Sequence, residues 1–202
     1  MSTPTASTPR IVPILGSKGG TGRTTAVVHL AAALARQGRR VAVMDTTALG
    51  DTTEWIQDAR AALPAGAELP FELLEAAGRA VPATSAEIVL VDTGGNGEAH
   101  ARLRPILEAS AMAVIPVQPS RIDLNSLWDT LDWLDLLYPG LPRLALLTMA
   151  TPTTTLYHET REALAEEDVP TLTTSIPQRI QYANAVGCLL YTSDAADDLL
   201  CV

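Results

Sequence analysis

The sequence predicts a single α/β domain in which a mainly parallel sheet is covered by helices on both faces. Short apolar runs alternate along the chain with amphipathic helical segments, which is the pattern of repeated strand–helix–strand units. Polar candidate residues follow the apolar runs, at the strand ends where ligands bind in such sheets. The 202 residues, 47% of them hydrophobic and 18% charged, suffice for one domain with a sizeable core.

The apolar runs define the predicted strands and the segments between them define the helices. We expect strands at 11–15, 41–45, 87–92, 112–117 and 144–148, and a weaker strand at 171–176. We expect helices at 24–37, 51–63, 98–109, 122–138 and 155–167. In the first helix, Val27, Leu30 and Leu34 share one face, and Gly38 follows the end as a helix-stopping glycine often does.

Two of the other helices carry further signals. Asp51 and Glu54 have the spacing of an N-cap residue and its partner three positions later. Helix 122–138 has an apolar stripe formed by Leu124, Leu127, Leu131 and Leu134. Its three regularly spaced carboxylates, Asp129, Asp132 and Asp135, are expected to form a solvated face and not a metal site.

Residues 1–10 are polar, without the apolar core of a secretory signal, and are expected to form a disordered tail. No apolar run approaches the roughly 18 residues of a membrane span. The expected location is therefore cytoplasmic.

The charge and the metal-ligand residues limit the function. A net charge of −9 opposes non-specific attraction of nucleic acid by the whole surface, although a local basic patch stays possible. Cys188 and Cys201 both lie in the last fifteen residues, so no upstream disulfide, zinc or iron–sulfur site is expected. His29, His100 and His158 are far apart in the sequence and are interpreted as isolated side chains.

Residues 17–25, "SKGGTGRTT", are close to the phosphate-binding pattern G-x-x-x-x-G-K-[ST]. Gly22 and Thr24 occupy the positions of the last glycine and the hydroxyl residue, but Arg23 occupies the position of the lysine. Lys18, inside the loop, is the only lysine among 14 basic residues. Keeping one lysine in a chain otherwise built with arginine favours a specific constraint at Lys18.

The loop and two carboxylates predict one nucleotide site. Glycines let backbone N–H groups turn toward phosphate oxygens, and the following helix adds its positive end. Thr24 can offer a hydroxyl to Mg²⁺, and Asp92 can hold the ion directly or through water. Asp45 ends the preceding strand on the same expected edge. The alternative is a glycine-rich turn without a ligand, with Asp92 as a helix cap.

Several segments resemble the ParA/MinD group of ATPases, and most closely the small plasmid-partition ParA proteins. "SKGGTGRTT" resembles their deviant Walker A loop, KGGxGK[ST], and "IVLVDTGG" resembles their Walker B segment. Further similar segments are "VAVMDTTALGDTTEW", "SAMAVIPVQPSRID" and "TSIPQRIQYANAVG". The resemblance covers residues 11–187 and implies a P-loop NTPase-like domain.

The resemblance also implies roles for single residues. Lys18 would reach across an ATP-sandwich dimer to the partner's phosphates, Asp45 would lie near the attacking water, and Asp92 would be the Walker B aspartate, sharing Mg²⁺ with Thr24. The implied ATP-binding residues are Ser17, Lys18, Gly19, Gly20, Thr21, Gly22, Arg23, Thr24 and Thr25.

As a function, the resemblance implies ATP hydrolysis coupled to dimerisation in plasmid or chromosome partition. The ATP-bound homodimer would bind DNA non-specifically near the nucleoid or plasmid, and a ParB-like protein would stimulate hydrolysis. The main alternatives are a MinD-like membrane-associated ATPase and an ATP-binding switch with impaired hydrolysis. An ATP-dependent ligase of the dethiobiotin or cobyrinic-acid type is a further alternative, for which no substrate-binding residues were identified.

The chain departs from the family pattern in three places. Thr47 replaces the second aspartate of D-x-D, and Ala48–Leu49 replace the usual Pro-Gln. Arg23 keeps the positive charge of the loop lysine but is wider, planar and differently directed, so its geometry beside the γ-phosphate is expected to be poorer. Residues 188–202 match nothing in the family and are interpreted as a sequencing artefact, without function, in place of a native C-terminal helix.

Overall fold

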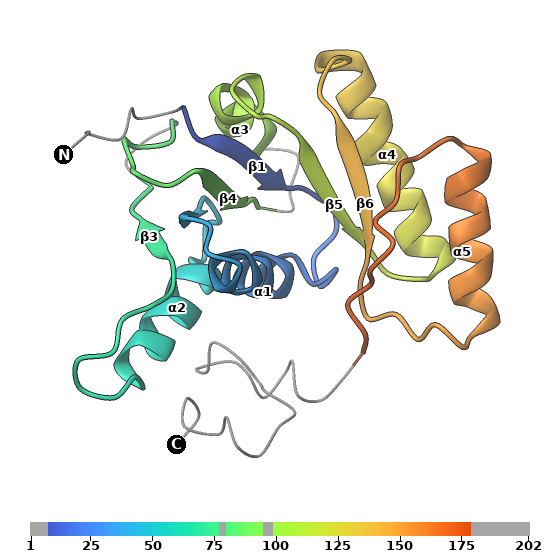
Figure 1. Cartoon of the computed structure of the whole chain (residues 1–202). Helices are drawn as coiled ribbons and strands as arrows, with labels where there is room; N and C mark the ends of the chain where they lie inside the picture. Colours follow the sequence, from blue (N-terminus) through green and yellow to red (C-terminus); the bar gives the residue numbers. More distant parts are fainter. Residues whose placement is uncertain (1–7, 77–79, 95–98, 179–202) are drawn as a thin grey trace.

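Six parallel strands form one sheet in the described part of the chain, which in this computed structural model comprises residues 8–76, 80–94 and 99–178 (Figure 1). The strands are β1 (Arg10–Ile14), β2 (Val41–Asp45), β3 (Glu72–Leu74), β4 (Ile88–Asp92), β5 (Ala113–Val117) and β6 (Arg143–Leu147). Their order in the sheet is β3-β2-β4-β1-β5-β6, and the paired strands are parallel. The predicted α/β class is confirmed.

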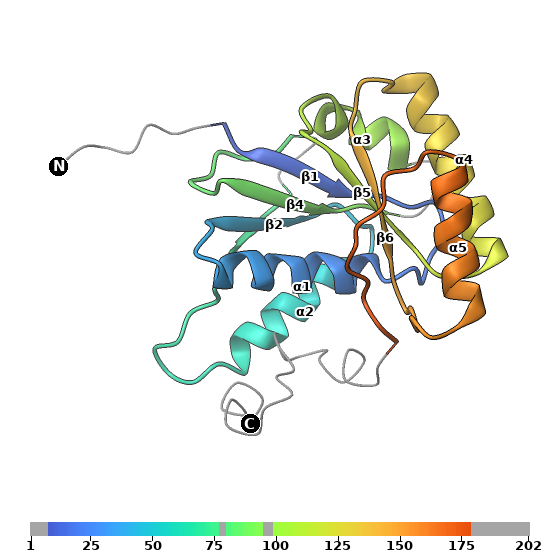
Figure 2. The ribbon, with the colours of Figure 1, turned by 45° about the vertical axis from the view of Figure 1, so that its right-hand side comes forward.

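Helices cover both faces of this sheet, as predicted. They are α1 (Arg23–Arg36), α2 (Asp51–Ala61), α3 (Ala99–Glu108), α4 (Arg121–Leu137) and α5 (Thr155–Glu166). Helices α1 and α2 lie on one face, and α3, α4 and α5 lie on the other (Figures 1 and 2). The side chains of each group pack in a separate apolar cluster. Because strand side chains alternate between faces, Val43 joins the first cluster and Met44 the second.

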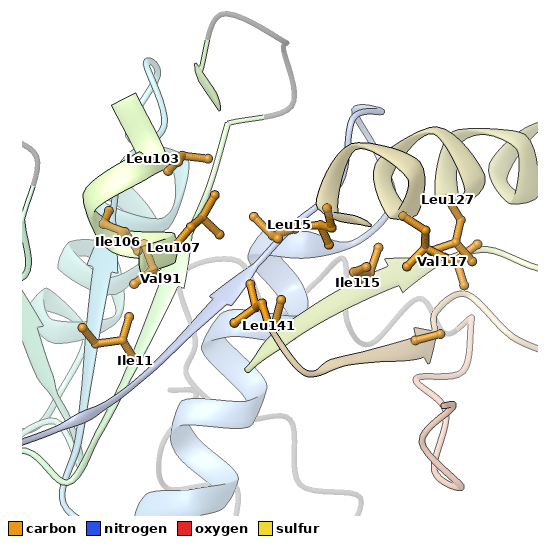
Figure 3. Packing of buried hydrophobic residues seen from close by; sticks show 14 of the residues in the cluster. Ile11, Leu15, Val91, Leu103, Ile106, Leu107, Ile115, Val117, Leu127 and Leu141 are labelled. Atoms are coloured by element: carbon orange, nitrogen blue, oxygen red, sulfur yellow. The ribbon is translucent and has the colours of Figure 1, made fainter. Parts of the chain in front are cut away.

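The packing explains why the strands read as continuous apolar runs in the sequence. All five residues of β2, and all five of β5, are buried because helices cover both sides. Figure 3 shows Ile115 of β5 and Leu127 of α4 within the second cluster. Each isoleucine or leucine buried in this way contributes roughly 1.5–3 kcal/mol to folding.

Two strand predictions differ from the structure. The sheet edge β3 was not predicted because it has three residues and begins with the exposed Glu72, too short for an alternating pattern. The weak strand predicted at 171–176 is not a strand. Thr171 makes an isolated bridge to β6, and Leu172 and Ile176 donate backbone hydrogen bonds to β6 at 2.9 and 2.8 Å. This segment lies between Pro170 and Pro177, which cannot donate to a ladder.

The start of α2 also differs from the prediction. Gly50, in the left-handed region at φ 74°, is the N-cap, so the prediction of Asp51 as N-cap is wrong. Asp51 and Glu54 lie in the first turn, where their charges favour the helix dipole. In α4 the predicted pattern is confirmed: the apolar stripe is buried, apart from the half-buried Leu124, and the three aspartates are exposed.

The predicted terminal segments lie largely outside the residues that the structure describes. Of the expected tail at 1–10, residues 1–7 lie outside the described residues, and β1 begins at Arg10. The segment 188–202 lies outside them entirely, as do residues 179–187 of the last family-like segment. Where the chain is described, none of its helices combines the length and apolar character needed to cross a membrane.

Candidate nucleotide-binding site

The predicted site residues meet at the carboxyl ends of three neighbouring strands. Asp92, the last residue of β4, is in register with Asp45 of β2 on one side and with Ile14 of β1 on the other. The glycine loop begins directly after β1. Strand order reverses around β1, which lies between β4 and β5, and such a point is where ligands bind in parallel sheets.

Two glycines give the loop its shape. Gly20 has φ 78° and Gly22 has φ 81°, in the left-handed region that residues with a Cβ rarely adopt. Gly22 is also the N-cap of α1, so the positive end of a 14-residue helix opens onto the loop. A loop of this geometry can present backbone N–H groups to an anion.

Side chains from neighbouring elements hold the loop in place. Gln118 donates from Nε2 to the carbonyl of Gly20 at 2.6 Å, and Thr148 donates from Oγ1 to the carbonyl of Thr21 at 2.7 Å. Ser17 is hydrogen-bonded to the hydroxyl of Ser126 in α4 at 2.6 Å. These contacts restrain the loop, and a restrained loop loses less entropy when it binds a ligand.

Arg23 is directed back into the loop. Its guanidinium donates to the carbonyl of Gly16 and, at 3.1 Å, to that of Lys18. Burial lowers the pKa of Arg23, and the nearby Asp92 opposes this shift; an arginine nevertheless stays charged at neutral pH. Both bonds come from Nη1, so the guanidinium is held against the loop carbonyls while the N–H groups of Nε and Nη2 are not used in them.

Thr24 and Asp92, the two predicted magnesium residues, are in direct contact. Thr24 donates from Oγ1 to Oδ2 of Asp92 at 2.8 Å, and Asp92 is fully buried. Its other oxygen, Oδ1, has no hydrogen-bond partner among the residues that the structure describes. Burial raises the pKa of Asp92, Asp45 raises it further, and hydrogen bonds from Thr52 and Thr24 lower it.

This pair suits Mg²⁺. A hydroxyl and an unpartnered carboxylate oxygen are the ligand types that Mg²⁺ takes from a protein when phosphates and water complete its shell. The described residues contain no group of three or more histidine, cysteine or acidic side chains that could hold a metal alone.

Asp45 fastens the connection between β2 and α2. Its carboxylate accepts from the backbone N–H of Thr47 at 2.8 Å and from that of Thr53 at 2.9 Å. The second bond caps the first turn of α2 from a neighbouring strand. Asp45 is 6% exposed, and further lone pairs of its carboxylate can accept a bond from water.

Lys18 is paired within the chain. Its ammonium lies 2.7 Å from Oδ1 of Asp123 in α4; the lysine side chain is 40% exposed and the aspartate 4%. Ser120, the N-cap of α4, accepts from the backbone N–H of Asp123 at 3.1 Å and its hydroxyl contacts the Asp123 carboxylate. Sequence reasoning missed Asp123, although the spacing of Ser120 and Asp123 is that of a helix cap and its partner.

Thr52 is a second residue that was missed. It is fully buried near the start of α2, and its hydroxyl donates to Oδ2 of Asp92, the oxygen that Thr24 also contacts. A threonine in an amphipathic helix carries no sequence signal for such a contact.

The chain matches the CobQ/CobB/MinD/ParA nucleotide-binding domain over residues 12–187 and belongs to this family. It is 38% identical over 131 residues to the maintenance of carboxysome distribution protein A of Gloeobacter kilaueensis, covering 63% of this chain and 57% of that protein. The match thus spans little more than half the length of that relative.

Solved structures of low sequence identity share the fold. A putative plasmid partition protein of Borrelia burgdorferi bound to AMPPNP has a TM-score of 0.69 at 15% identity, with 89% of both chains covered. The cobyrinic acid a,c-diamide synthase of Mycobacterium smegmatis, with a bound ATP analogue and magnesium, has a TM-score of 0.62 at 18% identity, covering 89% of this chain and 91% of that one. The structural likeness shows that these proteins share the α/β fold of this chain.

Proposed function

We propose that the protein is a ParA-like ATPase that dimerises with ATP and acts in the partition of a plasmid or chromosome. The observation that carries the proposal is the contact of Thr24 with the buried Asp92, beside a glycine loop that contains Lys18. The names of the partition protein and of the carboxysome-distribution protein support a role in positioning a large cargo. Non-specific DNA, a ParB-like partner and a cytoplasmic, nucleoid-associated location belong to the same proposal.

Each residue has a part in the proposed reaction. The loop N–H groups and the N-terminus of α1 bind the phosphates, while Thr24 and Asp92 hold Mg²⁺. Bound Mg²⁺ would supply positive charge to the phosphoryl oxygens. Asp45 orients the attacking water with the lone pairs that its two backbone contacts leave free.

The pairing of Lys18 suggests how nucleotide and association are coupled. In the single chain the ammonium is neutralised by Asp123. A second subunit with ATP would offer it triphosphate oxygens instead, so the dimer gains an interaction that depends on the nucleotide. Large apolar side chains at the same edge of the sheet support a protein contact there: Leu49 is 84%, Ile122 70% and Met149 40% exposed.

Arg23 favours a second form of the proposal, a switch that binds ATP but hydrolyses it slowly. Its guanidinium contacts two loop carbonyls, so it does not occupy the position of a free ammonium beside the phosphates. The two forms share nucleotide binding and dimerisation and differ in turnover.

Sedimentation with Mg-ATP and with Mg-ADP tests the proposal. We expect a dimer with ATP and a monomer with ADP, and DNA binding by the ATP form in a following assay. Lys18→Ala should weaken the ATP-dependent dimer and abolish hydrolysis, while nucleotide binding by the monomer falls less. Arg60→Ala, which removes an exposed positive charge from α2, is the control. A Lys18→Ala protein that dimerises as well as wild type contradicts the sandwich dimer.

A further inference from the structure

We infer that Thr52 is a positioning residue for Asp92, and that its hydroxyl links the magnesium site to the connection between β2 and α2. This inference rests on the proposed nucleotide site. Thr52 does not itself contact the metal in this arrangement; it acts through the carboxylate.

The contacts around the Asp92 carboxylate are asymmetric. Thr52 in α2 and Thr24 in α1 both donate to Oδ2, from two different helices. Oδ1 is buried and has no hydrogen-bond partner in the described part of the chain. Two donors on one oxygen fix the rotation of the carboxylate and leave Oδ1 as the oxygen that can take a further ligand. Without Thr52, only the bond from Thr24 would hold this orientation.

Burial makes the contact matter energetically. Both Thr52 and Asp92 have no exposed surface, so water cannot replace a lost hydroxyl. Thr52 therefore supports the direction of the group that would hold Mg²⁺.

Asp92 holds both ends of the connection between β2 and α2. Thr46 donates its backbone N–H and its hydroxyl to the carbonyl of Asp92, at 2.9 and 2.8 Å, and Thr52 binds the side chain. Between them, Gly50 donates to the hydroxyl of Thr47 at 3.0 Å, and Leu49 is 84% exposed. A ligand that holds the Asp92 carboxylate would therefore also restrain the connection between β2 and α2, on which Leu49 is exposed.

The neighbouring threonine provides a matched control. Thr53 contacts the site through its backbone N–H, which donates to Asp45, so a change of its side chain preserves that bond. Thr52→Val removes the hydroxyl at nearly constant shape, Thr52→Ser restores a hydroxyl, and Thr53→Val makes the same chemical change one residue away.

The test measures binding of a fluorescent, non-hydrolysable ATP analogue to the full chain during a Mg²⁺ titration and in EDTA. Thr52→Val should need about 10–100-fold more Mg²⁺ for half-maximal enhancement of binding, the usual effect of losing a partner of a metal ligand. Thr52→Ser and Thr53→Val should stay close to wild type. Binding in EDTA should be equal in all four proteins.

A Mg²⁺ requirement of Thr52→Val equal to that of wild type overturns the inference. So does an equal loss with Mg²⁺ and in EDTA that Thr52→Ser does not recover, because that is a general structural defect. Wild-type binding that does not depend on Mg²⁺ contradicts the proposed function itself, and the inference falls with it.

Amide hydrogen exchange tests the link to the connection separately. In wild type, Mg-nucleotide should slow exchange in residues 46–52, and in Thr52→Val saturated with Mg-nucleotide it should slow exchange less. Equal slowing in both proteins would overturn the link.

Discussion

Two carboxylates at opposite ends of β4 have opposite surroundings. Glu87, just before the strand, is paired with Arg39 at 2.8 Å and with Arg40 at 3.0 Å on an accessible surface. Asp92, at the other end, is fully buried and is contacted by the hydroxyls of Thr24 and Thr52. The hydrogen bond from Arg39 lowers the pKa of Glu87, whereas burial raises the pKa of Asp92.

The difference makes the carboxyl end of β4 the candidate for chemistry. An exposed ion pair is screened by water and salt and adds little to folding. A buried carboxylate without a neutralising cation in contact costs folding free energy, and such groups cluster at functional sites. Hydrogen bonds from Thr52 and Thr24 offset part of the cost of burying Asp92, and binding of a cation would offset more of it.

The largest expected effect comes from Asp45, the second carboxylate of that edge. Asp45→Ala should retain ATP binding and lose hydrolysis by about 10²–10⁴-fold, the usual contribution of a group that activates water. Phosphate release should be measured beside nucleotide affinity and ATP-dependent dimerisation, which should persist. Since Asp45 also caps α2, Asp45→Asn, which keeps an acceptor oxygen, separates the charge from the cap. Unchanged turnover in both variants would leave Asp45 as a helix cap alone.

Asp92→Asn separates the stability of the site from its function. The uncharged amide removes the cost of burying an ionised group, so the melting temperature should rise at pH 7 while Mg²⁺-dependent nucleotide binding is lost. Because the folded pKa of Asp92 is raised, wild-type stability decreases as pH rises from about 3.9, the ordinary aspartate value, through the folded pKa. The difference in stability between Asp92→Asn and wild type should therefore be largest above the folded pKa of Asp92 and should disappear below about pH 3.9. A lower melting temperature of the variant at pH 7 would contradict the conclusion that the buried charge of Asp92 costs folding free energy.

Arg23→Lys tests whether the shape of the charged side chain in the loop limits hydrolysis. A lysine is compact and need not bridge the carbonyls of Gly16 and Lys18, so it can lie beside the phosphates. We expect turnover to rise roughly tenfold, equivalent to about 1.4 kcal/mol of barrier, with a smaller change in ATP affinity. Single-turnover hydrolysis of both proteins measures this. Faster hydrolysis by the native protein would show that Arg23 is adapted to its position.

The sequence was sufficient to predict that the candidate site residues meet at one edge of the sheet. Buried parallel strands are apolar along their whole length, and the rule for strand ends brings Asp45 and Asp92 together without knowledge of side-chain contacts. The glycines were expected to let the loop backbone turn, and Gly20 and Gly22 have the left-handed conformation that residues with a Cβ rarely adopt.

The sequence did not predict the contacts between residues that are far apart in the chain. Lys18 and Asp123 are 105 positions apart, and Thr52 and Asp92 are 40 apart, so their pairing depends on how the helices dock. A threonine hydroxyl in a helix gives no periodic signal, and the direction of the Arg23 side chain follows from which carbonyls the loop exposes to it. Such details are set by tertiary packing and not by local pattern.

Glu87→Gln should have the smallest effect and tests the other end of β4. The variant keeps a polar side chain of the same size but loses the charge that Arg39 and Arg40 face. We expect the melting temperature at pH 7 to fall by no more than about 2–4 °C, and less in high salt, because screening already weakens the pairs in wild type. The lowered pKa of Glu87 means that its stabilising contribution is present above the ordinary glutamate pKa and is lost as pH falls through the folded value. Nucleotide binding and hydrolysis should not change, because Glu87 lies at the opposite end of the strand from Asp92. A change in Mg²⁺-dependent binding would show that the two ends of β4 are coupled and that the division between them is wrong.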